Sequence, residues 1–262
     1  MEQLLGNPML ANALQFAFEK ATTEGKITIT MLIIVSMFSW TVMIQKGRQL
    51  WKARTVGKKF FTAYRATRDP MELYNKQVEF PGAPAYDVYL AAAEELSYHL
   101  KNNPVSLRGK TLVSAGSFES VRVAMERAVS AQAISLEKGM IILSTAVAGG
   151  PFIGLLGTVW GVMETFSGIA KVQAASLIAM APGVAGALIA TVVGLFVAIP
   201  AMFAYNYMIT TIRAITQELD NFASEYHAAL EHAYVDNRPI ADEIADALRR
   251  VAPEAKSELA VV

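Results

Sequence analysis

The sequence predicts an all-α integral membrane protein with three transmembrane helices and long cytoplasmic helical extensions. Of its 262 residues, 53% are hydrophobic and the mean hydropathy is +0.34, which is high for a soluble domain. The excess lies in three uncharged stretches, each about as long as, or longer than, the roughly 20 residues that a helix needs to cross a bilayer. Two of these stretches are also dense in glycine and alanine, which is typical of membrane helices that pack against each other.

The composition excludes several classes of function. The chain has 23 Lys and Arg residues against 23 Asp and Glu residues, so it has no global attraction for nucleic acid. It has no cysteine, which removes disulfides and thiolate chemistry. Phosphate-loop, zinc-protease and nucleophile-elbow motifs are absent. His227 and His232 are five residues apart, a spacing that does not place them on the same helix face, and we expect both to be solvated. We therefore expect no enzyme, no metal and no cofactor.

The first span is predicted over residues 27–45, after a periplasmic N-terminal segment of residues 1–26. That segment either lies on the membrane surface or forms a terminal helix. The span has no glycine stripe, which favours a peripheral helix that faces lipid. Trp40 and Trp51 fit anchoring at the membrane interface.

The orientation follows from a run of basic residues directly after the first span. No acidic residue interrupts this run: Lys46, Arg48, Lys52, Arg54, Lys58, Lys59, Arg65 and Arg68. The positive-inside rule places them in the cytoplasm, so the N-terminus is periplasmic and the C-terminus cytoplasmic. The alternative is an RNA-binding patch, which the position directly after a span disfavours.

Residues 46–138 are predicted to be a cytoplasmic helical loop with a break at residues 80–84 and a helix over residues 85–102. A further helix is expected from about Ser117, whose side chain would cap it, running without interruption into the second span. Residues at three-to-four spacing, mostly apolar, support that helix: Val121, Met125, Ala128, Gln132 and Leu136.

The second span is predicted over residues 139–163, followed by a short periplasmic turn over residues 164–173. One stripe of small residues follows a single helix face: Gly150, Gly154, Gly157 and Gly161. Thr158 is a polar group within this surface. Glu164 marks the outer end, either as a solvated carboxylate or at the mouth of a pore.

The third span is predicted over residues 174–212, with a cytoplasmic helix and tail over residues 213–262. Its small residues again share a face: Gly183, Ala187, Ala190, Gly194, Ala198 and Ala201. Pro182 is expected to start the span proper, after a turn or kink, and Pro200 to bend it. An apolar stripe continues beyond the span: Ile212, Ile215, Leu219, Phe222, Tyr226 and Leu230. Ile240, Ile244 and Leu248 allow one more short helix.

Thr191 lies beside the small face of the third span, as Thr158 lies within that of the second. Each hydroxyl can satisfy itself by bonding to its own helix backbone. Alternatively, two hydroxyls that face a common cavity can bind water or a partner's carboxylate. The two stripes therefore predict either a shared helix interface or the lining of a pore.

Two strings in these spans carry a family resemblance. P-F-I-G-L-L-G-T-V-W-G-V-M, followed by A-P-G-V-A-G-A-L-I-A-T-V-V-G-L-F-V-A-I-P-A-M-F-A-Y-N, resembles the ExbB/TolQ family and, more distantly, MotA. The resemblance implies a ring of several copies, a pentamer, in the bacterial inner membrane, with Thr158 and Thr191 lining the central pore. It also implies an ExbD/TolR-like single-span partner in the pore, and a TonB/TolA-like protein energised by the proton-motive force.

The sequence departs from the family pattern at Gly186, where many members have Glu. Besides adding a small residue to the packing face, this leaves residues 139–163 and 174–209 without an ionisable group. A proton relay normally needs such a group, so the titrating carboxylate would come from the partner. The departure also motivates an alternative, a non-conducting scaffold of the same fold. A MotA-like stator for motility is a further alternative, disfavoured because that type usually has four spans.

Overall fold

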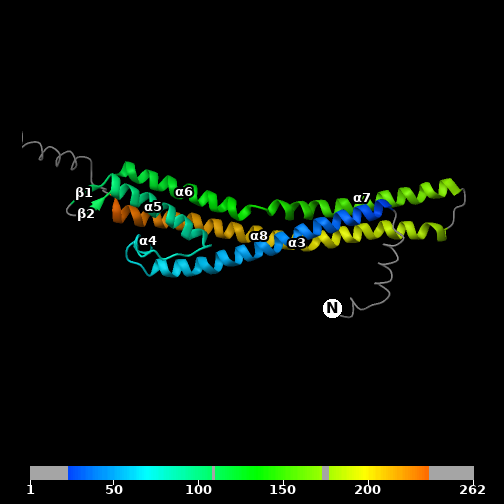
Figure 1. The fold of residues 1–262 in the computed structure, drawn as a ribbon, viewed down its shortest axis with the longest axis horizontal. Helices are drawn as coiled ribbons and strands as arrows, with labels where there is room; N and C mark the ends of the chain where they lie inside the picture. Colours follow the sequence, from blue (N-terminus) through cyan, green and yellow to red (C-terminus); the bar gives the residue numbers. More distant parts are fainter. Residues whose placement is uncertain (1–22, 108–109, 173–176, 236–262) are drawn as a thin grey trace, which may run out of the picture. The chain divides into compact units, whose positions relative to one another are not determined.

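The computed structural model describes residues 23–107, 110–172 and 177–235. Within them the chain is almost entirely helical (Figure 1). The elements are α3 (Thr23–Arg65), α4 (Glu72–Asn75), α5 (Pro84–Asn102), β1 (Val105–Leu107), β2 (Lys110–Leu112), α6 (Ala115–Glu137), α7 (Met140–Val172) and α8 (Leu177–Tyr234). The expectations for the N-terminal segment before residue 23 and for the tail from residue 236 lie outside the described residues.

Three helical stretches are long and apolar enough to cross a membrane. They lie within Thr23–Arg65, Ala115–Ala170 and Gly183–Tyr234. Residues 27–45 and 139–163 fall within the first two stretches, and residues 183–212 of the third predicted span fall within the last. The all-α fold and its three apolar helices fit the predicted class of membrane protein.

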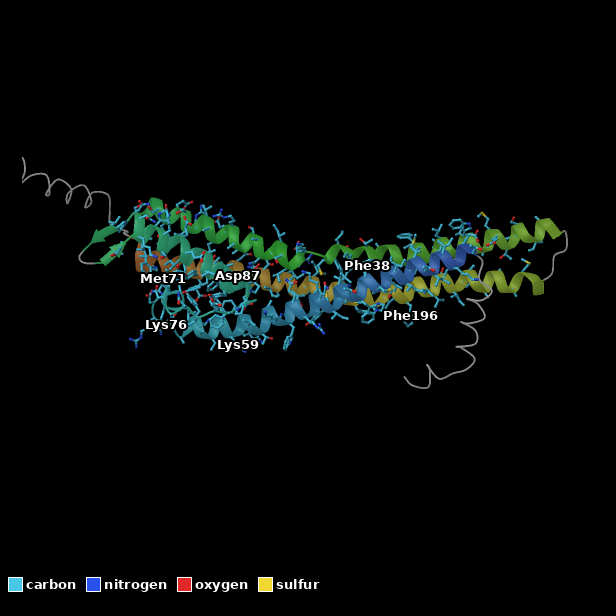
Figure 2. All side chains as sticks on the ribbon, viewed as in Figure 1. Phe38, Lys59, Met71, Lys76, Asp87 and Phe196 are labelled. Atoms are coloured by element: carbon cyan, nitrogen blue, oxygen red, sulfur yellow. The ribbon has the colours of Figure 1, made fainter. Side chains whose placement is uncertain are left out.

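The chain divides into two compact units. The first contains Met1–Arg54 and Ala133–Ile215, and so holds the apolar parts of α3, α7 and α8. Small residues of α8 are almost fully buried there: Ala187, Ala190, Ala198 and Ala201. Large apolar side chains point outwards from the same helices, among them Phe38 and Phe196, which are 60% and 79% exposed (Figure 2). This unit is therefore packed through small residues and covered by large apolar ones, as expected of helices in lipid.

The helix expected to run unbroken from Ser117 into the second span is interrupted, and that prediction was wrong. α6 ends at Glu137 and α7 begins at Met140. Gly139 between them has φ +87°, a left-handed conformation that glycine adopts without the clash of a Cβ. The start was also misplaced, because Ser114 accepts the Ser117 N–H at 3.2 Å and caps α6. Composition alone concealed the break, since Gly139 also suits an apolar span.

The turn predicted over residues 164–173 is largely helical, because α7 continues to Val172. The third helix begins at Leu177, five residues before Pro182, so Pro182 does not start it. Pro182 and Pro200 both lie inside α8, and Pro151 lies inside α7. A helix accommodates proline where neighbouring helices cover the freed carbonyl. Whether Pro182 and Pro200 kink α8 stays a prediction.

The second unit contains Thr55–Gln132 and Thr216–Val262. Its core is a cluster of aromatic rings from α3, α5, α8 and the loop before α5, and neighbouring ring centroids are mostly 5–6 Å apart. The rings are those of Phe60, Phe61, Tyr64, Phe80, Tyr86, Tyr89, Phe222 and Tyr226. Offset and edge-on ring pairs of this kind each add roughly 0.5–1.5 kcal/mol to simple burial. The two units therefore have different cores, aliphatic in the first and rich in aromatic rings in the second.

Two features predicted outside the apolar spans are confirmed. The break at residues 80–84 holds Gly82 with φ +94°, and Pro84 opens α5. The predicted stripe of α8 is buried throughout, each member at most 6% exposed: Ile212, Ile215, Leu219, Phe222, Tyr226 and Leu230. The antiparallel β1–β2 hairpin was not predicted, since three-residue strands give too little alternation to detect.

Candidate functional site

The contact between α7 and α8 forms through glycine at each level. A Cβ added to Gly150 would lie 3.0 Å from the Gly194 carbonyl oxygen. A Cβ on Gly154 would lie 2.9 Å from the Thr191 Cα, and one on Gly161 would lie 2.8 Å from the Ala187 Cβ. These separations leave no room for a side chain. The two glycine and alanine stripes predicted from sequence therefore do face each other.

Thr158 and Thr191 meet at the centre of this contact. The Thr158 hydroxyl lies 3.0 Å from the Gly154 carbonyl oxygen of its own helix. The Thr191 hydroxyl reaches the same oxygen from α8, also at 3.0 Å. The two hydroxyls are in hydrogen-bond contact with each other. The sequence left open whether each hydroxyl bonds to its own helix backbone or the two face a common site. The structure combines the two, because Thr158 bonds to its own backbone and also meets Thr191.

The proton count of this cluster matters for its chemistry. Three oxygens make three mutual contacts, but the two hydroxyls supply only two protons. One arrangement runs from Thr191 through Thr158 to the Gly154 carbonyl, and the other runs in the opposite order. In either arrangement a hydroxyl oxygen keeps a lone pair that can accept a proton from water or from a protonated carboxyl. Both threonines are partly exposed, so an external donor can reach them.

The first span contributes a threonine that sequence reasoning missed. Thr28 is 3% exposed, and its hydroxyl donates to the Gly25 carbonyl at 2.9 Å. A Cβ added to Gly157 would lie 2.8 Å from the Thr28 hydroxyl oxygen and 2.6 Å from the Ala190 Cβ. Gly157 is therefore the level at which α3, α7 and α8 converge. Nothing in the sequence distinguishes Thr28 from the neighbouring Thr30, since both precede apolar residues.

The remaining predicted residues are spread along the same two helices. Gly183 adjoins α7, because an added Cβ would overlap the Thr165 hydroxyl oxygen. Gly186 is buried, whereas Glu164 is exposed and makes no ion pair among the described residues. The structure therefore brings Thr158, Thr191 and the glycines together but does not bring Glu164 to them.

Lys46 has a role that its place in the basic run did not indicate. Its side chain is 8% exposed, although the other cations of that run are exposed. The ammonium donates to the carbonyls of Ser135 at 3.2 Å and Leu136 at 3.1 Å, and to the Gln49 side chain at 2.8 Å. These carbonyls lie in the last turn of α6, where no intrahelical donor remains. Burial and the charge of Lys138 lower the pKa of Lys46.

No cluster of three or more His, Cys, Asp or Glu side chains suited to a metal occurs among the described residues. The chemistry available at the α7–α8 contact is therefore that of hydroxyls and backbone carbonyls. Such groups can relay or accept protons and can coordinate ions, but they do not titrate near neutral pH.

These features define a class of protein: a helical multi-pass membrane protein whose second and third apolar helices pack through glycines around a paired-threonine site. Comparison with known proteins is consistent with this class. Residues 94–221 match the family described as the MotA/TolQ/ExbB proton channel family.

Individual relatives extend the similarity over most of the chain. The Tol-Pal system protein TolQ of Haemophilus influenzae is 32% identical, over 85% of this chain and 95% of the relative. TolQ of Pseudomonas aeruginosa is 32% identical, over 80% and 89% respectively. The biopolymer transport protein ExbB of Salmonella typhimurium is 31% identical, over 84% and 88%. The chain belongs to the MotA/TolQ/ExbB proton channel family.

Proposed function

We propose that the chain is the ring-forming subunit of an ion-driven motor in the bacterial inner membrane. In this proposal several copies, five in the family pattern, surround a pore lined by α7 and α8, and α3 lies outside, against lipid. The observation that carries the proposal is the Thr158–Thr191 pair, a hydroxyl site inside an otherwise apolar, glycine-packed contact. Family membership supports a role in ion conduction, and the large apolar side chains outside the first unit support contact with lipid or further copies.

The proposed orientation rests on the basic residues that follow the first span. Seven cations from Arg48 onwards are exposed or partly exposed on α3 and the loop after it, a pattern that the positive-inside rule assigns to the cytoplasm. The N-terminus is then periplasmic, Glu164 lies at the periplasmic end of the pore, and the C-terminal end of α8 is cytoplasmic. The long helices beyond the spans form the cytoplasmic extensions.

The proposed mechanism takes its titrating group from a second protein. Spans two and three contain no ionisable residue, and hydroxyls do not release protons at neutral pH. An ExbD/TolR-like single-span partner would place an aspartate beside Thr158 and Thr191. The threonine hydroxyls would then donate hydrogen bonds to the ionised aspartate and accept a hydrogen bond from the protonated one. Each charge that crosses supplies about 2.3 kcal/mol per 100 mV. A few protons therefore suffice to rearrange an interface and to drive a TonB/TolA-like protein that acts on the outer membrane.

Co-purification tests the assembly. The chain is expressed with its single-span partner, extracted in mild detergent and weighed by native mass spectrometry. We expect an oligomer of several copies that retains the partner. A stable monomer that binds no partner would contradict the proposal.

A second candidate, a non-conducting scaffold of the same fold, has one observation in its favour. The Thr158 hydroxyl is already satisfied by the Gly154 carbonyl of its own helix, and Gly186 replaces the carboxylate common in the family. A complex that assembles with its partner but conducts no ion would favour the scaffold.

A further inference from the structure

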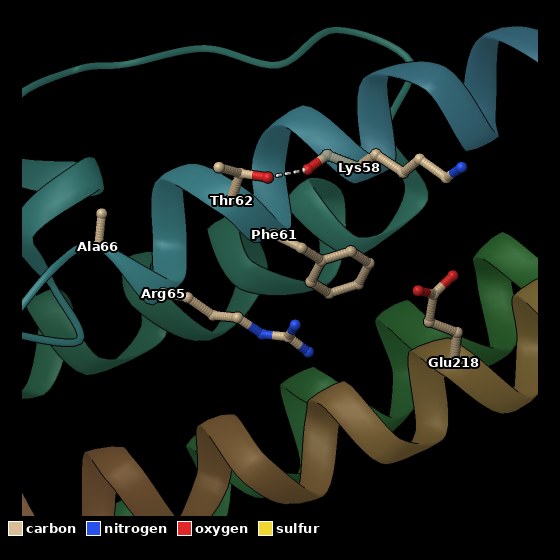
Figure 3. A pocket seen from close by; sticks show the side chains of 6 residues that line it. All are labelled: Lys58, Phe61, Thr62, Arg65, Ala66 and Glu218. Atoms are coloured by element: carbon tan, nitrogen blue, oxygen red, sulfur yellow. Dashed lines mark hydrogen bonds between the residues drawn. The ribbon is translucent and has the colours of Figure 1, made fainter.

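A charged hollow lies between α3 and α8 in the second unit. It measures about 590 Å³ and is lined by Lys58, Phe61, Thr62, Arg65, Ala66 and Glu218 (Figure 3). Lys58, Phe61, Thr62 and Arg65 share one side of the C-terminal end of α3, Ala66 follows directly, and Glu218 faces them from α8. The Thr62 hydroxyl donates to the Lys58 carbonyl at 2.9 Å, which leaves its lone pairs for another donor.

The charges of this hollow are not neutralised by the described residues. Lys58 and Arg65 lie seven residues apart, which places both on one helix face. Neither forms an ion pair within the described residues, and neither does Glu218. The Arg65 guanidinium lies 6.0 Å from the centre of the Phe61 ring. The hollow therefore offers two cations, one carboxylate and an aromatic wall to a bound group.

The C-terminal end of α8 lies close to this hollow. The Tyr234 hydroxyl donates to the Asp69 carboxylate at 2.8 Å, and Val235 pairs with Val113. Asp69 follows Arg65 by four residues, so their Cα atoms are separated by at most about 14 Å. Five residues beyond Val235 can extend about 17 Å. The tail therefore begins on the Arg65 side of the hollow, near enough for its residues to reach the hollow in the same chain.

The sequence in that range is complementary to the hollow. Residues 240–248 read I-A-D-E-I-A-D-A-L and carry three acidic and no basic residues, and Arg249 and Arg250 follow. Ile240, Ile244 and Leu248 repeat at intervals of four, so a helical conformation would place them on one face. We propose that residues 240–250 of the chain's own C-terminal tail bind in this hollow.

The direction of the chain gives this binding a register. The tail would arrive from the Arg65 end and proceed towards Lys58 and Glu218. In a helical conformation Asp242, Asp246 and Arg249 share one side, opposite Ile240, Ile244 and Leu248, so that charged side would face Arg65, Lys58 and Glu218. Asp242 and Arg249 are seven residues apart, about 11 Å in a helix, and Lys58 and Arg65 are the same distance apart along α3. Charge order and length therefore agree.

A lipid headgroup fits the hollow less well than the tail does. Lys58 lies thirteen helical residues beyond residue 45, the predicted end of the first span, or about 20 Å along α3. Headgroups extend only several ångströms beyond the hydrocarbon core of a bilayer. Arg48 lies within that range, whereas Lys58 and Arg65 lie beyond it.

Disulfide trapping tests the proposal in the full-length protein, which has no cysteine of its own. Thr62→Cys is combined with Ala245→Cys, oxidised in native membranes and compared with a matched pair, Lys59→Cys with Ala245→Cys. Lys59 is exposed on the same helix but does not line the hollow. We expect rapid cross-linking within single chains for the Thr62 pair and at least tenfold slower cross-linking for the Lys59 pair.

Charge reversal provides the second arm. Arg65→Glu should slow trapping of the Thr62 pair, and Asp242→Arg in the same chain should restore it. Raised salt should slow trapping too, because exposed charges are screened. Equal rates for the Thr62 and Lys59 pairs, cross-links only between different chains, or no response to Arg65→Glu would each overturn the proposal. None of these results bears on ion conduction, so the proposed function is tested separately.

Discussion

The substitution Gly154→Ala probes the α7–α8 contact most sharply. The added Cβ would lie 2.9 Å from the Thr191 Cα and 3.0 Å from the Ala190 carbonyl oxygen. Ordinary van der Waals contact begins at about 3.4 Å, and both opposing atoms are backbone, which cannot rotate away. α8 must therefore move by about half an ångström at this level.

The cost follows from this displacement. Overpacking a well-packed interface typically costs about 1–3 kcal/mol. Separating Thr191 from the Gly154 carbonyl removes a hydrogen bond worth about 1 kcal/mol. The better helix propensity of alanine returns about 1 kcal/mol. We expect Gly154→Ala to reduce the free energy of unfolding by about 1–3 kcal/mol.

Gly149→Ala is the matched control. Gly149 lies on the same helix, and an added Cβ would meet nothing within 4 Å. The same change should therefore be neutral or stabilising by up to about 1 kcal/mol. Equilibrium unfolding of both variants in mixed detergent micelles measures the difference. Equal stability of the two variants would refute the close approach of α7 and α8 at Gly154.

Three further predictions concern the joint between α6 and α7 and the aromatic core. Lys46→Met should destabilise the protein by about 1–3 kcal/mol in the same unfolding assay, because two carbonyls lose a charged donor. Lys46→Arg should recover part of this stability. A Lys46→Met variant as stable as the unaltered protein would show that the contact is not needed. Gly139→Ala should cost about 1–2 kcal/mol because its φ is +87°, whereas Gly116→Ala, with nothing within 4 Å of the added Cβ, should not. Burial raises the pKa of Tyr64 and of Tyr89 to about 12. The folded state therefore binds more protons than the unfolded state above pH 10, so the free energy of unfolding should fall between about pH 10 and 12. Tyrosinate absorbance should appear as the protein unfolds. Constant stability across that range would contradict the burial of these tyrosines.

Much of the fold was predictable because its signals are periodic. The stripe from Ile212 to Leu230 repeats at helical spacing, and each of its six members is buried. The meeting of Thr158 with Thr191 followed from glycine stripes on two successive apolar segments, since each stripe needs a close partner and the other is the nearest available in sequence. Pattern and packing agree here because small residues in a span have few other uses.

The rest depended on interactions between segments distant in sequence. Lys46 is one cation among eight in a row, and only the unpaired carbonyls at the end of α6 distinguish it. Gly139 was read as part of a span because its φ is invisible in composition. Thr28 is buried only because Gly157 faces it from α7. A single sequence does not encode such pairings in any local pattern.

The measurement that tests the central claim most directly is proton flux into vesicles that hold the chain with its single-span partner. Thr158→Val and Thr191→Val remove one hydroxyl each while keeping the side-chain shape. Thr41→Val is the control, because that exposed hydroxyl bonds only to the Met37 carbonyl of its own helix. We predict partner-dependent flux that falls at least tenfold in both site variants and is unchanged in the control. Flux that is equal in all three variants, or absent although the complex assembles, would contradict the proposed ion pathway.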